Sequence, residues 1–573
     1  MKRKPRYDKT LAVLLMALSL LPLLQGWLRL VALKPLHGVT IEAEKPVFDM
    51  GSYRSGAYAK DMEAYASQRF GFREPVIRLY NQYLWTFYRK TYAHDVAIGK
   101  KDWLYYPQSV SDYYGNELLR WHPSVDEARR SFDLDVKHAN WVRSVLKESG
   151  VDFLVFMAPE KGFLYPEFLP DGEKDTTTFN ACDYFAQRFT ETGFPHIEMT
   201  RWFQQMKDTV DYPLIPQVGA HWIFPSVYAA DSLSRLMEDL KGIHLPKIKV
   251  GEAYHTRDRD HDYDNDLEKL LNLAFAMRHQ YGYCPRRHVG IEQDSSDVKP
   301  KVLFVGNSYF WAMNLFVPFD EMFETTEFWY YYSTAYYGDS LQHTAKVNEL
   351  DQLDKLLGFD YVVWFTTGNQ MNKGTSAFVN ATLLNLCLSN AQVDETRNRV
   401  VDSLIRDSIP SPVDSLTMAQ LRLGFWSKAQ QILVKHPERY FAELGGDSLP
   451  PTARNPRIKE ILAINEIRKD SAWMWNLSAC QTVIQNAPLE QVLLMEARNM
   501  IDGKPLLRDM PDPVAVRDLV EQRVADMIKE IRGKPKLMRR VEEKAAKNGV
   551  SVEKQTELDA RWIVHGQMPS AGF

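Results

Sequence analysis

The hydrophobic pattern of the chain begins with one long apolar run. Basic residues crowd the first nine positions (Lys2, Arg3, Lys4, Arg6 and Lys9), and the run from Leu11 to Trp27 is broken only by Ser19, Pro22 and Gln25. A helix rises about 1.5 Å per residue, so about 18 residues nearly cross a hydrocarbon core of about 30 Å. Basic flanks stay on the cytoplasmic side. The pattern predicts a single-pass anchor in the cytoplasmic membrane, with the bulk of the chain on the outward, periplasmic side.

Two other interpretations of this run stay open. A cleaved signal peptide has a shorter apolar core followed by small residues in an A-x-A-like site, whereas Gly26-Trp27-Leu28 follows here. A buried core helix is the second alternative. The length of the run and its basic flank favour an uncleaved anchor over both.

Short apolar runs in the middle of the chain predict buried strands. Val151-Asp-Phe-Leu-Val-Phe-Met follows a stripe of helical period from Asp126 to Glu148. Val302-Leu-Phe-Val precedes a plausible helix, and Tyr361-Val-Val-Trp-Phe follows the helix-like stretch Val347–Leu357. Alternating helices and buried strands are typical of an α/β fold. We expect an open, mostly parallel sheet with helices on both faces, whose functional site lies beyond the carboxyl ends of its strands.

The pattern changes at about residue 388, where long stretches rich in Leu, Ile, Glu, Lys and Arg predict an all-helical region. An internal repeat lies within it: Glu466-Ile-Arg and Met495–Gly503 are echoed by Glu530-Ile-Arg and Leu558–Gly566. This spacing favours two copies of a helical-hairpin unit. Chance similarity between helix-rich sequences is the alternative.

The length, charge and cysteine content of the chain limit the classes of function that it can have. The chain has 573 residues, 45% of them hydrophobic and 25% charged, with a net charge of −4. This length exceeds what one core usually needs, so two or three domains are expected. The near-neutral balance gives no reason to expect a nucleic-acid partner. Four scattered cysteines permit one or two disulfides without requiring any, and their spacing predicts no metal site.

A candidate nucleophile follows the second predicted strand. In Val305-Gly306-Asn307-Ser308-Tyr309 a small-residue turn at a strand end is followed by a hydroxyl. A serine there points its oxygen out of the sheet, beside backbone N–H groups that can stabilise an oxyanion. The alternative is that Asn307 or Ser308 merely caps the next helix.

A serine needs a base, and His221 is the candidate among fourteen histidines. It lies in the irregular segment Gln217-Val-Gly-Ala-His-Trp222, ahead of a predicted helix from Ser226 to Leu240. From there a ring nitrogen could reach the same sheet edge. A structural contact between His221 and its neighbouring Trp222 is the competing interpretation.

Four motifs in one order carry a resemblance to a known family. They are Gly99-Lys-Lys-Asp-Trp-Leu-Tyr105, Ala158–Pro170 with its Pro-Glu-Lys and Tyr-Pro, Ala220-His-Trp222 and Gly306-Asn-Ser-Tyr309. Together they resemble the SGNH-hydrolase-like domain of alginate O-acetyltransferases and their relatives in polysaccharide acetylation, over about residues 60 to 370. The resemblance implies Ser308 and His221 as a catalytic pair, with Gly306, Asn307, Tyr309 and Trp222 around the substrate or oxyanion. The hydrophobic pattern and the resemblance together predict four parts: a cytoplasmic basic stub and membrane anchor (1–33), an N-terminal extension (34–89), an SGNH-like acyltransferase domain (90–387) and a helical domain (388–573).

Two residues depart from the family pattern. The family has an aspartate two residues before the histidine, where it would orient the imidazole, and this chain has Gly219. The acidic run Asp258–Asp266 is the nearest substitute in sequence, and we select Asp260 and Asp262 as candidates for the third catalytic residue. A solvated loop leading into a helix from Leu267 and a metal loop are the alternatives. The second departure is Asn307, which replaces the usual aspartate or threonine.

The run Phe328-Trp-Tyr-Tyr-Tyr332 is aromatic throughout. Flat rings can stack on sugars, but strand propensity favours a strand whose alternate rings pack into a core.

The resulting hypothesis is an extracytoplasmic O-acetyltransferase that moves an acyl group through Ser308 to hydroxyls of an exported or cell-surface polysaccharide. Acyl-coenzyme A is not available outside the cytoplasm, so a membrane-embedded acyl-transferring partner is expected, and no cofactor or metal is. A carbohydrate esterase and a non-catalytic scaffold or carbohydrate-binding protein are the alternatives; the scaffold is motivated by Gly219.

Overall fold

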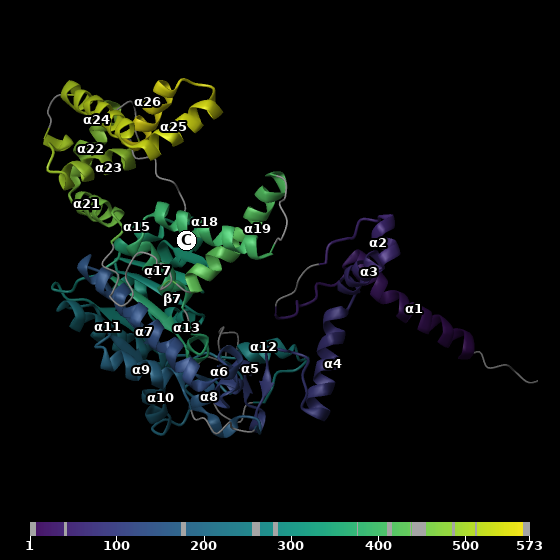
Figure 1. The fold of residues 1–573 in the computed structure, drawn as a ribbon. Coiled ribbons are helices and arrows are strands. Elements are labelled where there is room, and N and C mark those ends of the chain that lie inside the picture. Colours follow the sequence, from purple (N-terminus) through teal and green to yellow (C-terminus); the bar gives the residue numbers. More distant parts are fainter. Residues whose placement is uncertain are drawn as a thin grey trace, which may run out of the picture.

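The computed structural model describes residues 7–38, 43–172, 179–254, 264–278, 285–374, 376–408, 415–435, 437, 454–483, 488–509 and 513–564. An α/β body lies between a group of N-terminal helices and a helical C-terminal region (Figure 1). The predicted fold class is confirmed.

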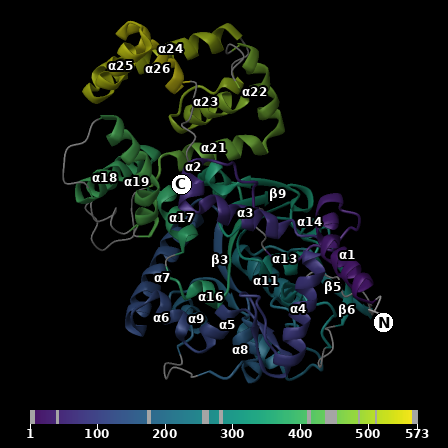
Figure 2. The ribbon, with the colours of Figure 1, turned by 90° about the vertical axis from the view of Figure 1, so that its right-hand side faces the viewer.

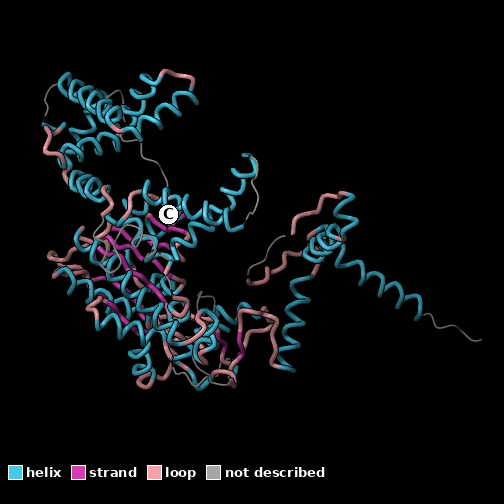
Figure 3. The backbone as a smooth tube through the Cα atoms, viewed as in Figure 1, coloured by secondary structure: helices cyan, strands magenta, loops and turns pink. Residues whose placement is uncertain are grey.

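The body is built on a seven-stranded sheet with the strand order β10-β9-β8-β7-β11-β3-β4. The five strands from β8 to β4 are parallel, whereas β9 and β10 pair antiparallel at one edge. Figure 3 shows the strands gathered in the centre of the body. Their bounds are β3 (Asp152–Met157), β4 (His196–Glu198), β7 (Lys301–Gly306), β8 (Thr325–Tyr330), β9 (Thr334–Tyr337), β10 (His343–Lys346) and β11 (Tyr361–Thr366).

Both faces of the sheet are buried, because successive side chains of a strand point to opposite faces. Phe153 and Val155 belong to one hydrophobic cluster, and Leu154 and Phe156 belong to another. The first cluster is completed by α7 (Val125–Glu148), α9 (Ala181–Glu191), α15 (Gln352–Leu357) and α17 (Ala377–Cys387). The second is completed by α10 (Thr200–Lys207), α11 (Ser226–Lys241), α13 (Tyr309–Phe316) and α14 (Phe319–Met322). The predicted helices on both faces are therefore present.

Shorter elements lie outside the seven-stranded sheet. The two-residue strands β1 (Ala97–Ile98) and β2 (Leu104–Tyr105) pair with each other, and β5 (Lys247–Tyr254) pairs with β6 (Arg286–Glu292). The short α-helices are α5 (Pro107–Tyr113), α6 (Asn116–Trp121), α8 (Lys161–Leu164), α12 (Asp266–Leu271) and α16 (Gly368–Met371). The 3-10 turns are η1 (Lys100–Asp102), η2 (Pro166–Phe168), η3 (Asp339–Leu341), η4 (Val347–Glu349) and η5 (Leu507–Asp509).

The N-terminal helices are α1 (Tyr7–Leu28), α2 (Met50–Ser55), α3 (Ala57–Gln68) and α4 (Arg73–Tyr88). In the described part of the chain, only Leu11–Leu28 is long and apolar enough to cross a membrane by length and composition, and 6% of that segment is buried. The helices α2 to α5 lie between residues 35 and 120, a stretch rich in aromatic residues whose sequence has no clear period.

The C-terminal region is all-helical wherever the structure describes it. It comprises α18 (Asn390–Ser408), α19 (Ser415–Lys435), α21 (Arg457–Lys469), α22 (Ser471–Val483), α23 (Leu489–Ile501), α24 (Pro513–Gly533), α25 (Pro535–Asn548) and α26 (Val552–Val564). Three of the four cysteines are described, and Cys182, Cys387 and Cys480 are free thiols.

The repeat in this region is larger than the predicted hairpin. Each echoed pair spans three helices, α21 to α23 in the first copy and α24 to α26 in the second. Residues at equivalent positions of the two copies have similar environments: Ala497 and Ala560 are both fully buried. In the first copy Arg498 pairs with Glu460, and in the second Arg561 pairs with Glu521, each joining the third helix of its unit to the first.

Candidate active site

Ser308 lies at the carboxyl end of β7, at the N-cap of α13. Gly306 is required just before it, since a Cβ there would come within 2.0 Å of the Phe365 carbonyl oxygen on the neighbouring strand β11. The close approach of the two strands fixes the turn that presents the serine. The predicted position of Ser308 at a strand end is therefore observed.

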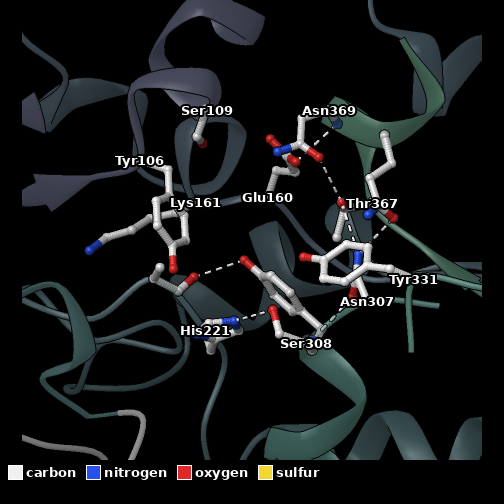
Figure 4. A pocket seen from close by; sticks show the side chains of 13 residues that line it. Tyr106, Ser109, Glu160, Lys161, His221, Asn307, Ser308, Tyr331, Thr367 and Asn369 are labelled. Atoms are coloured by element: carbon white, nitrogen blue, oxygen red, sulfur yellow. Dashed lines mark hydrogen bonds between the residues drawn. The ribbon is translucent and has the colours of Figure 1, made fainter. Parts of the chain in front are cut away.

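His221 reaches the same edge from the irregular segment that precedes α11. Its Nε2 atom lies 2.7 Å from Ser308 Oγ (Figure 4). The imidazole is 5% exposed and contacts two aromatic rings, with ring centroids 5.0 Å away at Tyr309 and 6.4 Å away at Tyr106. The two residues selected from the sequence therefore meet within hydrogen-bonding distance.

A carboxylate completes the chain of hydrogen bonds. Asp266, the first residue of α12, places Oδ2 2.5 Å from His221 Nδ1, and its Oδ1 accepts the backbone N–H of Ala220 at 2.8 Å. An ionised carboxylate only accepts, so Nδ1 carries the proton and Nε2 is free to accept from the Ser308 hydroxyl. The carboxylate missing at Gly219 is thus supplied by the last residue of the acidic run. Asp260 and Asp262 lie outside the described residues.

A buried lysine supports the segment that carries His221. The ammonium group of Lys161 donates to the carbonyl oxygens of Pro216, Gln217 and Gly219 at 2.6 to 3.0 Å. It also donates to that of Leu104 at 2.6 Å. Burial lowers the pKa of this amine well below its ordinary value. Lys161 therefore links β2 to the irregular segment before His221. Its ammonium group donates the hydrogen bonds that water would otherwise supply to the carbonyl oxygens of that segment. It occupies the lysine position of the Pro-x-Lys motif, so that motif was the available signal.

Three of the groups expected around an oxyanion are engaged elsewhere. The indole N–H of Trp222 donates to the Tyr309 carbonyl at 2.9 Å, and its side chain is fully buried. The backbone N–H of Tyr309 donates to Asn307 Oδ1 at 3.1 Å. The Asn307 amide donates to Thr367 and Gln370. Trp222 and Asn307 thus brace the turn around Ser308, and the expected place of Trp222 beside the substrate stays a prediction.

The opposite wall of the pocket carries acidic and amide groups. Ser109, Glu160, Thr367 and Asn369 line it, facing Ser308 and His221 (Figure 4). The backbone N–H of Asn369 donates to Glu160 Oε1 at 3.0 Å. Asn369 follows β11, and the sequence offered no signal for it beyond its place after a predicted strand.

Glu160 forms a buried carboxyl pair with Asp112. Burial raises the pKa of both groups, that of Asp112 well above its ordinary value, and the neighbouring Glu160 raises it further. Asp112 Oδ2 and Glu160 Oε2 accept no hydrogen bond from the described residues. Two carboxyls in contact cannot both ionise cheaply, so a proton shared between these oxygens keeps the pair at a single negative charge or less.

The aromatic run divides between core and pocket. Phe328 and Trp329 on β8 are fully buried, as the core interpretation expects. Tyr331 is 52% exposed and lines the pocket beside Ser308. Across the described residues, no group of three or more His, Cys, Asp or Glu side chains is placed to bind a metal ion.

A mostly parallel α/β sheet with a Ser–His–Asp chain at its carboxyl edge defines the class of SGNH-type hydrolase-like domains. Comparison of the sequence with protein families agrees: residues 96–319 match the SGNH hydrolase-like domain, acetyltransferase AlgX. This part of the chain is therefore similar to the AlgX acetyltransferase domain, and the resemblance predicted from the four motifs is confirmed. The family that residues 96–319 match is a family of enzymes.

Solved structures give more distant similarities. The O-acetyltransferase domain of Pseudomonas putida AlgJ is 14% identical; the match covers 48% of this chain and 92% of that one, with a TM-score of 0.32. Pseudomonas aeruginosa AlgX is 13% identical, with 51% and 65% covered and a TM-score of 0.32. Bacillus cereus PatB1 with a sulfonyl adduct is 11% identical, with 43% and 93% covered and a TM-score of 0.26. No curated protein matches the sequence.

Proposed function

We propose that this protein is a membrane-anchored O-acetyltransferase that carries an acetyl group on Ser308 and transfers it to hydroxyls of an exported polysaccharide. The single observation that carries the proposal is the hydrogen-bonded chain from Ser308 Oγ through His221 to Asp266. This arrangement turns a weak hydroxyl nucleophile into a reactive one. The family match supports acetyl as the acyl group.

The first half-reaction loads the enzyme. Ser308 Oγ attacks the acetyl carbonyl of the donor while its proton passes to His221 Nε2. Asp266 stabilises the imidazolium that forms and holds the ring in the correct tautomer. Collapse of the tetrahedral intermediate breaks the bond to the donor oxygen, which takes the proton from His221. An acetyl-serine remains.

The second half-reaction reverses the roles. A sugar hydroxyl enters the pocket and gives its proton to His221 as its oxygen attacks the acetyl-serine. The Ser308–acetyl bond then breaks, Ser308 Oγ recovers the proton, and the acetylated sugar leaves. Water in place of the sugar would make the protein an esterase, so the acceptor alone separates these two functions.

Two donors are available for the oxyanion. In the described part of the chain, neither the backbone N–H of Ser308, at the start of α13, nor the side-chain amide of Asn369 donates a hydrogen bond within the protein. Both residues line the pocket. Donors left unpaired at a helix N-terminus and opposite the nucleophile are suited to the charge that develops on the carbonyl oxygen.

The helix α1 supports the proposed location of the enzyme. Its apolar segment and basic N-terminal flank favour a membrane anchor with the body on the periplasmic side. Because no acyl-coenzyme A is available there, a membrane-embedded protein supplies the acetyl group. Anchoring confines enzyme and donor to the same surface.

The test uses purified full-length protein in nanodiscs with an activated acetyl ester. Mass spectrometry is expected to find an acetyl group on the peptide that contains Ser308. The adduct disappears in Ser308→Ala and falls sharply in His221→Ala, while the exposed control His244→Ala labels like the wild type. Acetyl transfer to an added oligosaccharide, measured against release of free acetate, distinguishes transferase from esterase.

A second outcome would favour the scaffold alternative. That alternative was motivated by the missing carboxylate at Gly219, whose place Asp266 takes. Absence of any Ser308 adduct with several activated esters, in protein whose fold is intact by circular dichroism, would reject the proposed catalysis.

A further inference from the structure

The helix α4 exposes a stripe of large apolar side chains. Val76, Tyr80, Tyr83 and Phe87 recur at helical spacing and are 54%, 49%, 48% and 70% exposed. Leu79 beside them is 59% exposed. An apolar stripe of this kind is normally buried against another element. Tyr92, after the end of α4, stacks on Tyr80 with ring centroids 6.0 Å apart, and the stripe nevertheless stays about half exposed or more.

The opposite side of the same helix is attached to the body. Trp85 is buried in a cluster with Leu267, Leu271 and Val218. The amide of Asn81 donates to the Leu271 carbonyl at 2.9 Å. The exposed stripe therefore belongs to a helix that is firmly seated on its other side.

The start of α4 packs against the anchor helix. The backbone N–H of Gly71 donates to the carbonyl of Pro22 at 3.1 Å, and Gly26 lies so close that a Cβ on it would be 2.4 Å from the Arg69 carbonyl oxygen. Pro22 lies six residues before Leu28, the end of α1. At 1.5 Å per residue that is about 9 Å below the end of the apolar helix, a depth at which interfacial helices lie.

The charge around the stripe has the sign that suits a lipid surface. Between Arg69 and Lys90 there are five basic residues and one acidic residue, in a chain whose net charge is −4. Basic side chains are attracted to anionic headgroups, and Tyr side chains concentrate at the membrane–water interface. Figure 1 shows α4 between α1 and the body, so its outer side is the side on which α1 lies.

We propose that the exposed stripe of α4 lies in the headgroup region of the outer leaflet and binds anionic phospholipid, as an interfacial helix beside the anchor. This inference rests on the membrane anchoring in the proposed function. It adds a second, in-plane attachment that fixes the orientation of the body, which a single spanning helix alone leaves free to swing.

The attachment connects the bilayer to the catalytic acid. The residues that seat α4 contact α12, whose first residue is Asp266. The same cluster includes Ala220, the neighbour of His221. The membrane-facing helix thus lies one layer from the site.

Photocrosslinking of the full-length protein tests the proposal. A p-benzoylphenylalanine in place of Tyr83 or Phe87 is irradiated in phosphatidylglycerol-containing vesicles, and adducts are identified by mass spectrometry. The matched control carries the same group in place of Trp475, an aromatic residue that is 73% exposed in the C-terminal region. Lipid adducts at positions 83 and 87, with none above background at 475, are expected.

The other outcomes overturn the proposal. Adducts at position 83 that contain a membrane protein and no lipid, in native membranes, would assign the stripe to a protein partner. Equal lipid labelling at all three positions, or none at 83 and 87, would show that α4 does not lie in the bilayer surface. Acetylation of Ser308 by a soluble ester is measured on the same samples, so failure of the lipid contact is distinguishable from failure of catalysis.

Discussion

Asp266 Oδ2 and His221 Nδ1 lie 2.5 Å apart, although 45 residues separate them in the chain. The contact forms because α12 begins beside the segment that carries His221: the N–H of Glu268 donates to the Val218 carbonyl, and that of Ala220 to Asp266 Oδ1. A carboxylate from a separate helix therefore takes the role that the family pattern gives to the position of Gly219. It also holds the backbone next to the histidine.

Replacing Asp266 by Asn should lower the rate of Ser308 acetylation by about 10⁴-fold, the loss seen when a serine-protease triad loses its aspartate. The amide preserves the shape but favours the wrong imidazole tautomer. Stopped-flow measurement of acetylation with an activated ester checks this. The exposed control Glu252→Gln should react at the wild-type rate. A loss below about tenfold, about 1.4 kcal/mol of transition-state stabilisation, would mean that Asp266 has no such role.

Replacing Asn369 by Ala should lower kcat by about 10² to 10³-fold with little change in KM, because an oxyanion donor acts mainly in the transition state. Steady-state kinetics with a soluble ester separates the two constants. The surface variant Asn348→Ala serves as the control. A rise in KM with unchanged kcat would instead place Asn369 in ground-state binding.

Replacing Lys161 by Met should destabilise the protein by about 3 kcal/mol or more, since several buried carbonyls lose their donor at about 1–3 kcal/mol each. Ser308 acetylation should fall as well, because the segment before His221 loses its support. Urea unfolding and labelling measure the two effects. Lys207→Met is the matched control: Lys207 also donates to a backbone carbonyl, that of Leu164, but its side chain is only partly buried. The urea midpoint of Lys207→Met should differ little from that of the wild type. A shift as large as that of Lys161→Met would contradict the special role of Lys161.

The Asp112–Glu160 pair predicts a pH dependence. Burial raises the pKa of both carboxyls, so the folded protein binds more protons than the unfolded chain once the pH exceeds the ordinary carboxyl value of about 4. The contribution of this pair to the free energy of unfolding is fully present below the ordinary carboxyl pKa. It is lost as the pH rises toward the raised pKa values of the two groups. Asp112→Asn removes one of the two ionisable groups. The urea midpoint of the variant, relative to that of the wild type, should therefore rise as the pH increases from about 4 to about 8. A constant difference across that range would contradict the shared proton.

The local hydrophobic pattern was sufficient to predict the strands at the centre of the fold. The strands β3, β7 and β11 are continuous apolar runs, and such runs are typical of strands buried on both faces. Ser308 and His221 could be selected because one ends such a strand and the other lies in a motif of matching order. Ser308 lies at the carboxyl edge because it follows β7, whereas His221 reaches that edge from the segment between α10 and α11.

The remaining parts of the site depend on tertiary contacts. Asp266 lies in an acidic run whose members look alike in sequence, and only the docking of α12 beside Val218 distinguishes it. Glu160 and Lys161 stood inside a recognised motif, but burial gave them their roles. The helix α4 escaped detection because its apolar stripe is exposed while its seated side carries the polar Asn81, so the apolar positions do not mark the buried face.

The duplicated C-terminal unit has its own consequence. The first copy encloses a hydrophobic cluster around Ile467 and Leu493, and the second encloses a separate one around Ile531 and Ala560. Because each copy buries its own centre, stability accumulates copy by copy, as in linear arrays. Loss or duplication of the second copy would leave the core of the body intact, whereas the first copy is joined to that core through Ile458 and Ile461 of α21.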